Sequence, residues 1–118
     1  MTWARTAAAT TNTVQECEIT GIIPEAVRQD PYVAYCARIW GARVTAHLAA
    51  VQRLRAAEAA HADAVHDWCG SRTTNDHLRQ AERLLGNAIE AEGLANYWVH
   101  LGQHGYQEAV TSRLRVSR

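Results

Sequence analysis

The sequence contains no phenylalanine and no lysine, and it has only two prolines, three cysteines and one methionine among its 118 residues. Every basic side chain is therefore an arginine, and the 12 bases balance 12 acids to give a formal net charge of zero. A neutral chain has no long-range field that attracts nucleic acid or an anionic membrane, so we expect neither as a partner. Alanine-rich, lysine-free usage is typical of a GC-rich genome, such as that of an actinobacterium or its phage.

The three cysteines, Cys17, Cys36 and Cys69, are an odd number at wide spacing, and they form neither a disulfide framework nor a paired-cysteine metal motif. The first residues lack the apolar stretch of a cleaved secretion signal. The longest uncharged stretch, residues 93–107, contains two histidines, an asparagine and two glutamines, so it is too polar to span a membrane. These features predict reduced thiols in a cytoplasmic protein.

Proline is confined to positions 24 and 31, and its absence from the rest of the chain favours long helices. Asp30 and Pro31 predict a helix start, because aspartate caps a helix and proline suits its first position. The helical pattern continues to Trp68 and stops at Gly70.

A second helix is predicted over residues 75–101, capped by Thr73 or Thr74. We expect the glycines at 102 and 105 to break it and a last short helix to follow at 106–114.

The first 30 residues form a separate arm in this interpretation. Thr13 and Glu16 match a capping box, which predicts a short helix over residues 13–20, and one further turn is expected at 24–29. The predicted domains are therefore an N-terminal arm with a short helix (1–30) and a helical hairpin domain with a C-terminal short helix (31–118).

Heptad seams run along both long helices. The first seam consists of Val33, Ala37, Trp40, Val44, His47, Val51, Leu54, Glu58, His61, Val65 and Trp68, and the second of Leu78, Ala81, Leu85, Ala88, Glu92, Ala95 and Val99, widened by Leu84, Ala91 and Trp98. The fold class is all-α: a long antiparallel helical hairpin, with short N- and C-terminal helices. A two-helix hairpin leaves half of each seam exposed, so we expect dimerisation or a protein partner to complete a four-helix bundle.

The antiparallel register places residue 101 opposite residue 42, so residues 31–41 overhang the second helix. That stretch needs a cover: the N-terminal isoleucines, the last helix or a second chain. The predicted interface consists of Val33, Trp40, Val44, Val51 and Leu54.

Polar residues on the first seam are the main chemical signal. Glu58 and His61 form a Glu-x-x-His pair, which in ferritin-like bundles contributes to a dinuclear metal site, and Glu82 is the candidate third ligand. Fe, Mn or Zn would be the metal. The alternative is a structural polar layer, in which Glu58 and His61 pair with each other or with Arg55, and Glu92 pairs with Arg55 or His47.

No P-loop, nucleophile elbow or dinucleotide-binding motif is present. The sequence therefore favours a non-enzymatic protein that acts by protein–protein interaction: a homodimer, an adaptor, or a phage structural or inhibitory protein.

The turn sequence Trp68-Cys69-Gly70 resembles the Trp-x-Gly hairpin of the small secreted WXG proteins. That resemblance implies a dimeric, all-helical protein exported without a cleaved signal. Two features differ from the family pattern: the 30-residue N-terminal extension, and the lack of an acidic residue four positions after Tyr97 or Tyr106, where Leu101 and Val110 stand.

Overall fold

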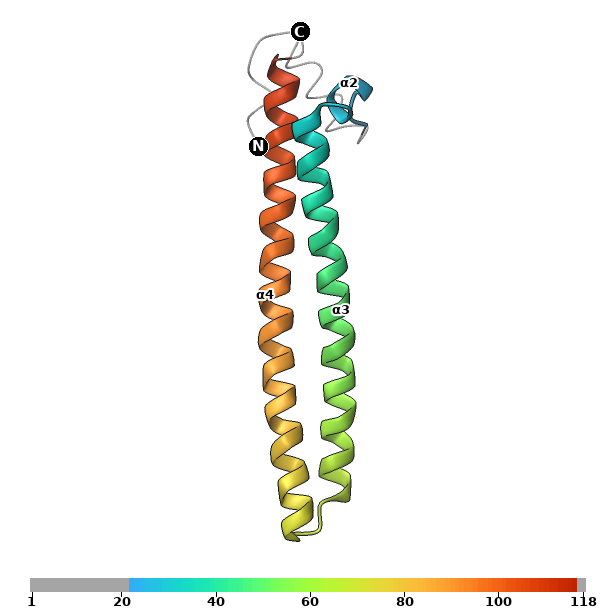
Figure 1. Cartoon of the computed structure of the whole chain (residues 1–118), viewed down its shortest axis with the longest axis vertical. Helices are drawn as coiled ribbons and strands as arrows, with labels where there is room; N and C mark the ends of the chain where they lie inside the picture. The colour runs from blue at the N-terminus through green and yellow to red at the C-terminus, as the bar shows by residue number, and fades with distance from the viewer. Residues whose placement is uncertain (1–21, 117–118) are drawn as a thin grey trace. The chain divides into compact units, whose positions relative to one another are not determined.

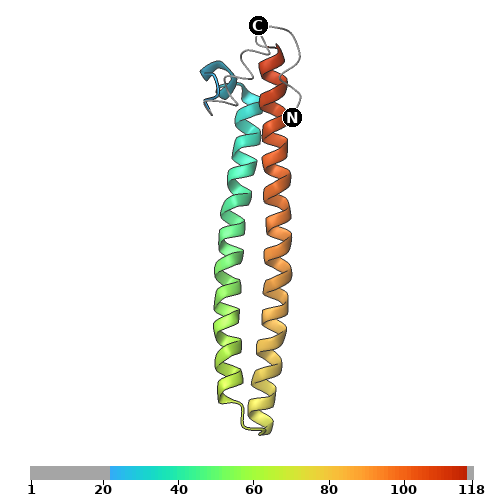
Figure 2. The ribbon, with the colours of Figure 1, turned by 180° about the vertical axis from the view of Figure 1, so that it is seen from behind.

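The computed structural model describes residues 22–116, which contain three helices (Figure 1): α2 (Glu25–Arg28), α3 (Pro31–Asp67) and α4 (Arg72–Val116). Helices α3 and α4 run antiparallel and are joined by a turn, as the view from behind also shows (Figure 2). The all-α helical hairpin predicted from the sequence is confirmed, as is the helical turn before Pro31. The helix predicted over residues 13–20 lies outside the described residues.

Helix α4 continues through the two glycines that were predicted to break it. The separate C-terminal helix at 106–114 is therefore a wrong prediction, because those residues belong to the same helix as 75–101. A glycine inside a helix costs only about 1 kcal/mol relative to alanine, whereas proline costs about 3 kcal/mol. Packing of the last turns of α4 against α3 outweighs a cost of this size.

The chain divides into two compact units, of which the first contains the described residues 22–41 and 100–116. Its core is formed by fully buried side chains from all three helices: Val27, Val33, Ala109, Val110 and Leu114, with Ile23, Cys36 and Tyr106 packed against them. The predicted overhang of residues 31–41 is thus covered by the last turns of α4 and by α2. The indole ring of Trp40 also lies 5.3 Å from the ring of Tyr106, centroid to centroid.

Asp30 caps α3 as predicted, and it also holds α4. Its Oδ1 accepts hydrogen bonds from the backbone amides of Tyr32 (2.9 Å) and Val33 (3.2 Å), and its Oδ2 accepts one from Nε of Arg113 at 2.9 Å. Burial alone would raise the pKa of Asp30, but the hydrogen bond from Arg113 and the two amide hydrogen bonds outweigh it and lower this pKa. The guanidinium of Arg113 also lies over the ring of Tyr32.

The second unit contains residues 42–99, where α3 and α4 pack along their seams. The predicted seam of α4 from Leu78 to Val99 is buried or half-buried throughout, which confirms it. On α3 the predicted series is only half right. The positions on the inner side are Arg43, His47, Ala50, Leu54, Ala57, His61 and Ala64, whereas Val44, Glu58 and Val65 are exposed.

Alanine explains this difference in α3. The methyl groups of Ala50, Ala57 and Ala64 recur every seven residues, and those of Ala81 and Ala88 do so on α4. Small side chains let two helix backbones approach closely, so they occupy the line of contact while the larger valines stand beside it. Within the described part of this unit, the buried apolar side chains are Ala50 and Ala81.

The turn between the helices is built around Gly70, whose φ of +82° is the left-handed conformation that glycine tolerates best. The hydroxyl Oγ of Ser71 accepts a hydrogen bond from the amide of Thr74 at 3.2 Å, so Ser71, not Thr73 or Thr74, caps α4. The indole Nε1 of Trp68 donates to Oδ1 of Asn75 at 2.6 Å and ties the two sides of the turn together. Helix α4 starts at Arg72, three residues earlier than predicted.

None of the helices in residues 22–116 has a stretch apolar and long enough to cross a lipid bilayer.

Candidate interaction surface

Two shallow grooves lie between α3 and α4 in the second unit. The first, here called the turn groove, encloses about 320 Å³ beside the α3–α4 turn and is lined by Ala60, Ala64, Asp67, Thr74, His77, Gln80, Ala81 and Leu84. The second, the tryptophan groove, encloses about 400 Å³ and is lined by Arg43, Ala46, Ala91, Leu94, Ala95 and Trp98.

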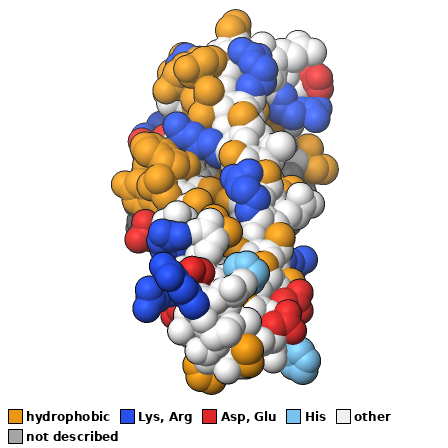
Figure 3. Space-filling model, turned by 60° about the horizontal axis from the view of Figure 1, so that its bottom comes forward, with side chains coloured by type: hydrophobic (Ala, Val, Ile, Leu, Met, Phe, Trp, Pro, Cys, Tyr) orange, Lys and Arg blue, Asp and Glu red, His pale blue; other side chains and the backbone are white. Residues whose placement is uncertain are grey.

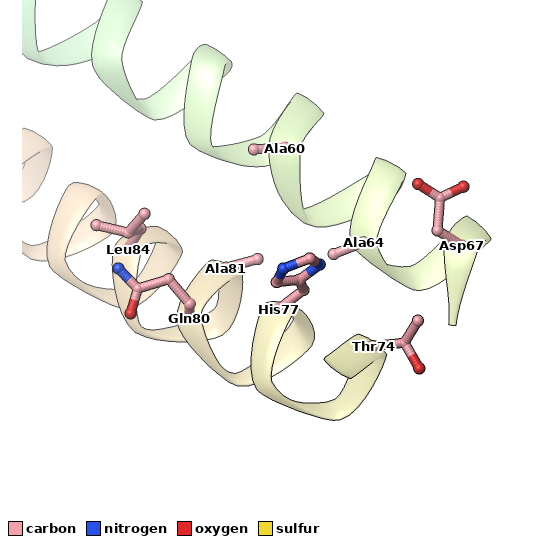
Figure 4. Close-up of a pocket in the computed structure, with 8 residues that line it drawn as sticks. All are labelled: Ala60, Ala64, Asp67, Thr74, His77, Gln80, Ala81 and Leu84. Atoms are coloured by element: carbon pink, nitrogen blue, oxygen red, sulfur yellow. The ribbon is translucent and has the colours of Figure 1, made fainter. Parts of the chain in front are cut away.

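The turn groove owes its shape to small side chains. Figure 4 shows the imidazole of His77 between the methyl groups of Ala64 and Ala81, with Asp67 and Thr74 at the end nearest the turn. Polar groups therefore lie along the groove, with Gln80 beside Leu84 at the end away from the turn, while alanines form its floor.

The tryptophan groove is bounded by an aromatic ring. The guanidinium of Arg43 lies 5.1 Å from the ring centroid of Trp98, and its Nη1 donates to the Trp98 carbonyl at 3.4 Å. This contact holds the cation at the edge of the groove. Leu94 and Trp98 stay 57% and 42% exposed, so the groove presents apolar surface that nothing in the second unit covers.

Both grooves open on the same side of the second unit. On α4 their lining includes His77, Leu84, Ala91 and Trp98, which are spaced by seven residues and therefore share one helix face. On α3 the residues Ala46, Ala60 and Asp67 follow the same seven-residue register. We call this side of the second unit, with the two grooves, the groove face.

A different row of apolar side chains flanks the seam on the other side. Val44, Val51 and Val65 share one seven-residue register on α3, in which Glu58 stands between the last two, and Ile89 takes the matching position on α4. This row is here called the valine face, and all of its members except the half-buried Val51 are exposed. Figure 3 shows how hydrophobic side chains reach the molecular surface between charged ones.

The structure separates the five predicted interface residues. Val33 is only 1% exposed because it belongs to the core of the first unit, and Trp40 is half-buried there against Tyr106. Val44 and Val51 lie on the valine face, and Leu54 is half-buried in the seam. The exposed part of the predicted interface therefore lies on the valine face. The groove face contains Leu84, Ala91 and Trp98, which the sequence placed at the edge of the second seam, and the other residues of this face were not among the predicted interface residues.

The candidate metal ligands are not gathered by the fold. Glu58 and Glu82 are exposed, whereas His61 is half-buried in the seam. Within residues 22–116, no three side chains of histidine, cysteine, aspartate or glutamate come together in a way that could hold a metal ion.

The polar pair that does form across the seam is His47 with Glu92. The Nε2 atom of His47 donates to Oε2 of Glu92 at 2.7 Å, and both side chains are about three-quarters buried. This contact is one of the two pairings that the sequence offered for Glu92. It joins α3 to α4 at one height and so helps to fix their register.

A free, exposed cysteine lies in the turn between α3 and α4. Cys69 is exposed, its amide donates to Oγ1 of Thr74 at 3.4 Å, and its Sγ lies 3.7 Å from the same oxygen. Hydrogen bonds from Ser71, side chain first and then backbone, and from Thr74 lower the pKa of the Cys69 thiol. Cys69 therefore ionises more readily than an ordinary exposed cysteine.

No protein-family model, no curated protein and no solved structure matches this chain.

Proposed function

We propose that this protein acts without catalysis, by binding another polypeptide through the groove face of residues 42–99. The observation that carries this proposal is the composition of the seam in residues 42–99. Its buried apolar side chains are the two alanines Ala50 and Ala81, while the larger Leu84, Leu94 and Trp98 are exposed beside it. Large apolar side chains that line grooves and are rimmed by polar groups are typical of binding surfaces.

The form of the grooves favours a helix as the ligand. Both lie along the line between two antiparallel helices, and alanines allow a further helix backbone to come close. Leu94 and Trp98 are anchors of the kind that dominate binding energy, since each exposes a large apolar side chain next to a recess. A partner helix seated there completes the bundle that two helices begin.

Site-specific photo-crosslinking tests the proposal in cells that carry the natural gene. A photoreactive amino acid in place of Leu94 is expected to form covalent adducts with a protein. The same amino acid in place of Glu82, which is exposed on the side of α4 away from the grooves, is expected to form none. Equal adducts from both positions, or no adduct from Leu94, would show that the groove face is not a binding surface.

The valine face is tested in parallel, because it contains the exposed part of the interface predicted from the sequence. A photoreactive residue at Val44 that gives the adducts, with Leu94 silent, would move the binding surface from the groove face to the valine face.

A further inference from the structure

We infer that the polypeptide that occupies the groove face is a second copy of this chain, packed with its α3–α4 turn at the opposite end. This inference rests on the proposed function, since it names the partner of the same surface. It is carried by the distribution of charge along that surface.

One arginine and one aspartate line the two grooves, one in each half of the groove face. Arg43 lines the tryptophan groove and Asp67 lines the turn groove, and the two stand at equal distances before and after residue 55. Arg53 shares the register of Ala46 and Ala60 and lies close to the middle of the face. Asp63 lies one helical turn before Asp67. Within the described part of the chain, none of Arg53, Asp63 and Asp67 forms an ion pair.

A two-fold axis across the middle of this face makes the charges of the two copies complementary. Two face-to-face copies related by such an axis place α3 antiparallel to its counterpart, so that Arg43 of each copy comes level with Asp67 of the other. On α4 the same axis brings Trp98 level with the turn groove of the second copy. The tryptophan groove of each copy thus faces the turn groove of the other, and Arg43 faces the carboxylate of Asp67.

The valine face does not offer the same match to a second copy. Glu58 and Glu82 share its seven-residue register near its middle. A two-fold axis there brings no base of this row opposite these carboxylates, whereas Arg43 and Asp67 of the groove face are opposite in sign. Charge therefore selects the groove face for self-association.

The area available is that of a stable dimer. Residues 42–67 of α3 rise about 39 Å, and two packed helices are about 20 Å wide. The face of each copy then covers about 800 Å², which gives about 1,600 Å² in total, the standard size of a specific interface.

The first test measures mass in solution by light scattering and sedimentation equilibrium. The full chain is expected to have about twice its chain mass of 13.1 kDa. The Leu94→Glu variant is expected to be monomeric, whereas Leu48→Glu, an equally exposed leucine on the other side of the seam, is expected to remain dimeric. A mass of one chain at every concentration overturns the inference, as does loss of the dimer in Leu48→Glu alone.

Charge reversal tests the orientation. Arg43→Asp and Asp67→Arg are each expected to weaken dimerisation roughly tenfold, because like charges then meet. The double variant is expected to return to within about threefold of the unchanged chain, since the pair is restored in reverse. Arg55→Asp, which makes the same change of charge outside the groove face, serves as the control. Failure of the double variant to recover, with its helical circular dichroism unchanged, overturns the antiparallel arrangement.

Distances between spin labels provide a readout that does not depend on these variants. In a background of Cys17→Ser, Cys36→Ala and Cys69→Ser, a single label is placed at Gln52 or at Arg72. If the α3–α4 turns of the two copies lie at opposite ends, the two Arg72 labels are about 40 Å apart along the helix axis. The two Gln52 labels are then within about 10 Å of each other along the same axis. Equal separations along the axis at the two sites would show parallel copies and overturn the inference.

The failure of this inference is distinguishable from failure of the proposed function. A monomeric chain whose Leu94 crosslinks to a different protein refutes the second copy and supports the groove face as a binding surface. A monomeric chain whose Leu94 forms no adduct refutes both.

Discussion

Glycine acts in opposite ways at different positions of this chain. Gly70 adopts a φ of +82° in the turn, where a side chain would be strained. Gly86 and Gly93 lie within α4, and a Cβ added at either would meet nothing within 4 Å. The same residue type is therefore required at one position and costs stability at the other two.

Alanine at the helical positions is expected to stabilise the fold. Gly86→Ala and Gly93→Ala should each raise the free energy of unfolding by about 0.5–1 kcal/mol, because alanine loses less backbone entropy in a helix. Gly70→Ala should lower it by about 1 kcal/mol or more. Urea unfolding followed by circular dichroism measures all three, and a loss of stability in both helical variants would contradict the model of α4 as a continuous helix.

Asp30 is the residue whose ionisation is coupled to folding of the first unit. Its pKa is lower in the folded state, so the folded protein releases this proton more readily than the unfolded chain does. The stabilisation is therefore complete above the ordinary aspartate range, about pH 4, and is lost as the pH falls through the lowered value.

Asp30→Asn keeps a cap for α3 and removes the charge, whereas Arg113→Gln removes the partner and keeps the cap. As the pH is lowered from 7 to 3, the free energy of unfolding of both variants should fall by less than that of the unchanged chain. Urea unfolding across that range is the measurement. Variants with the pH dependence of the unchanged chain would show that the contact between Asp30 and Arg113 does not carry the effect.

At the scale of the helices, the sequence predicted α3 to within one residue of its end, because Asp30, Pro31 and Gly70 are local signals. It misjudged α4 because Gly102 and Gly105 read locally as a break. The contacts of Ala109, Val110 and Leu114 that keep the helix intact come from residues far away in the chain.

The candidate surface shows the same difference between what local sequence signals predict and what contacts between distant residues decide. The hydrophobic pattern predicted that Val44 and Val65 lie in the seam, but in the structure the closely packed positions are occupied by alanines next to them. Recurrence of Ala50, Ala57 and Ala64 every seven residues was the signal that could have corrected the seam. The position of the grooves, in contrast, depends on how α3 is rotated against α4, and a single-helix pattern does not contain that information.

The pair His47–Glu92 makes a prediction for the packing of α3 on α4. Glu92→Leu should lower the free energy of unfolding by about 1–2 kcal/mol, because it leaves His47 without its acceptor. The double variant His47→Leu/Glu92→Leu should recover most of this loss, since two apolar side chains replace a polar pair.

Chemical denaturation of the two single variants and the double variant gives the coupling energy. Glu90→Leu, on the exposed side of α4, is the control and should change stability by less than about 0.5 kcal/mol. Additive effects of the two substitutions would mean that the pair does not act across the seam.

At the scale of the whole molecule, association should be visible as a dependence of stability on concentration. If folding of the described hairpin is completed by a second copy, the melting temperature rises with protein concentration, because mass action favours the associated folded state. The Leu94→Glu variant should melt at a lower temperature that does not change with concentration.

Calorimetry over a hundredfold range of concentration makes this measurement. The Leu48→Glu variant should keep the concentration dependence of the unchanged chain, since Leu48 lies away from the grooves. A melting temperature independent of concentration in the unchanged chain would show that its folded state needs no second copy.

The alanines at the contact between α3 and α4 also change which substitutions lower stability most. In an ordinary core, trimming a large side chain opens a cavity and does the greatest harm. Where the contact line consists of methyl groups there is little to trim, and a larger side chain at Ala50, Ala57 or Ala81 must push two backbones apart. Along this seam, the substitutions that destabilise the hairpin most are therefore those that enlarge a side chain. A larger core would require several simultaneous substitutions on both helices.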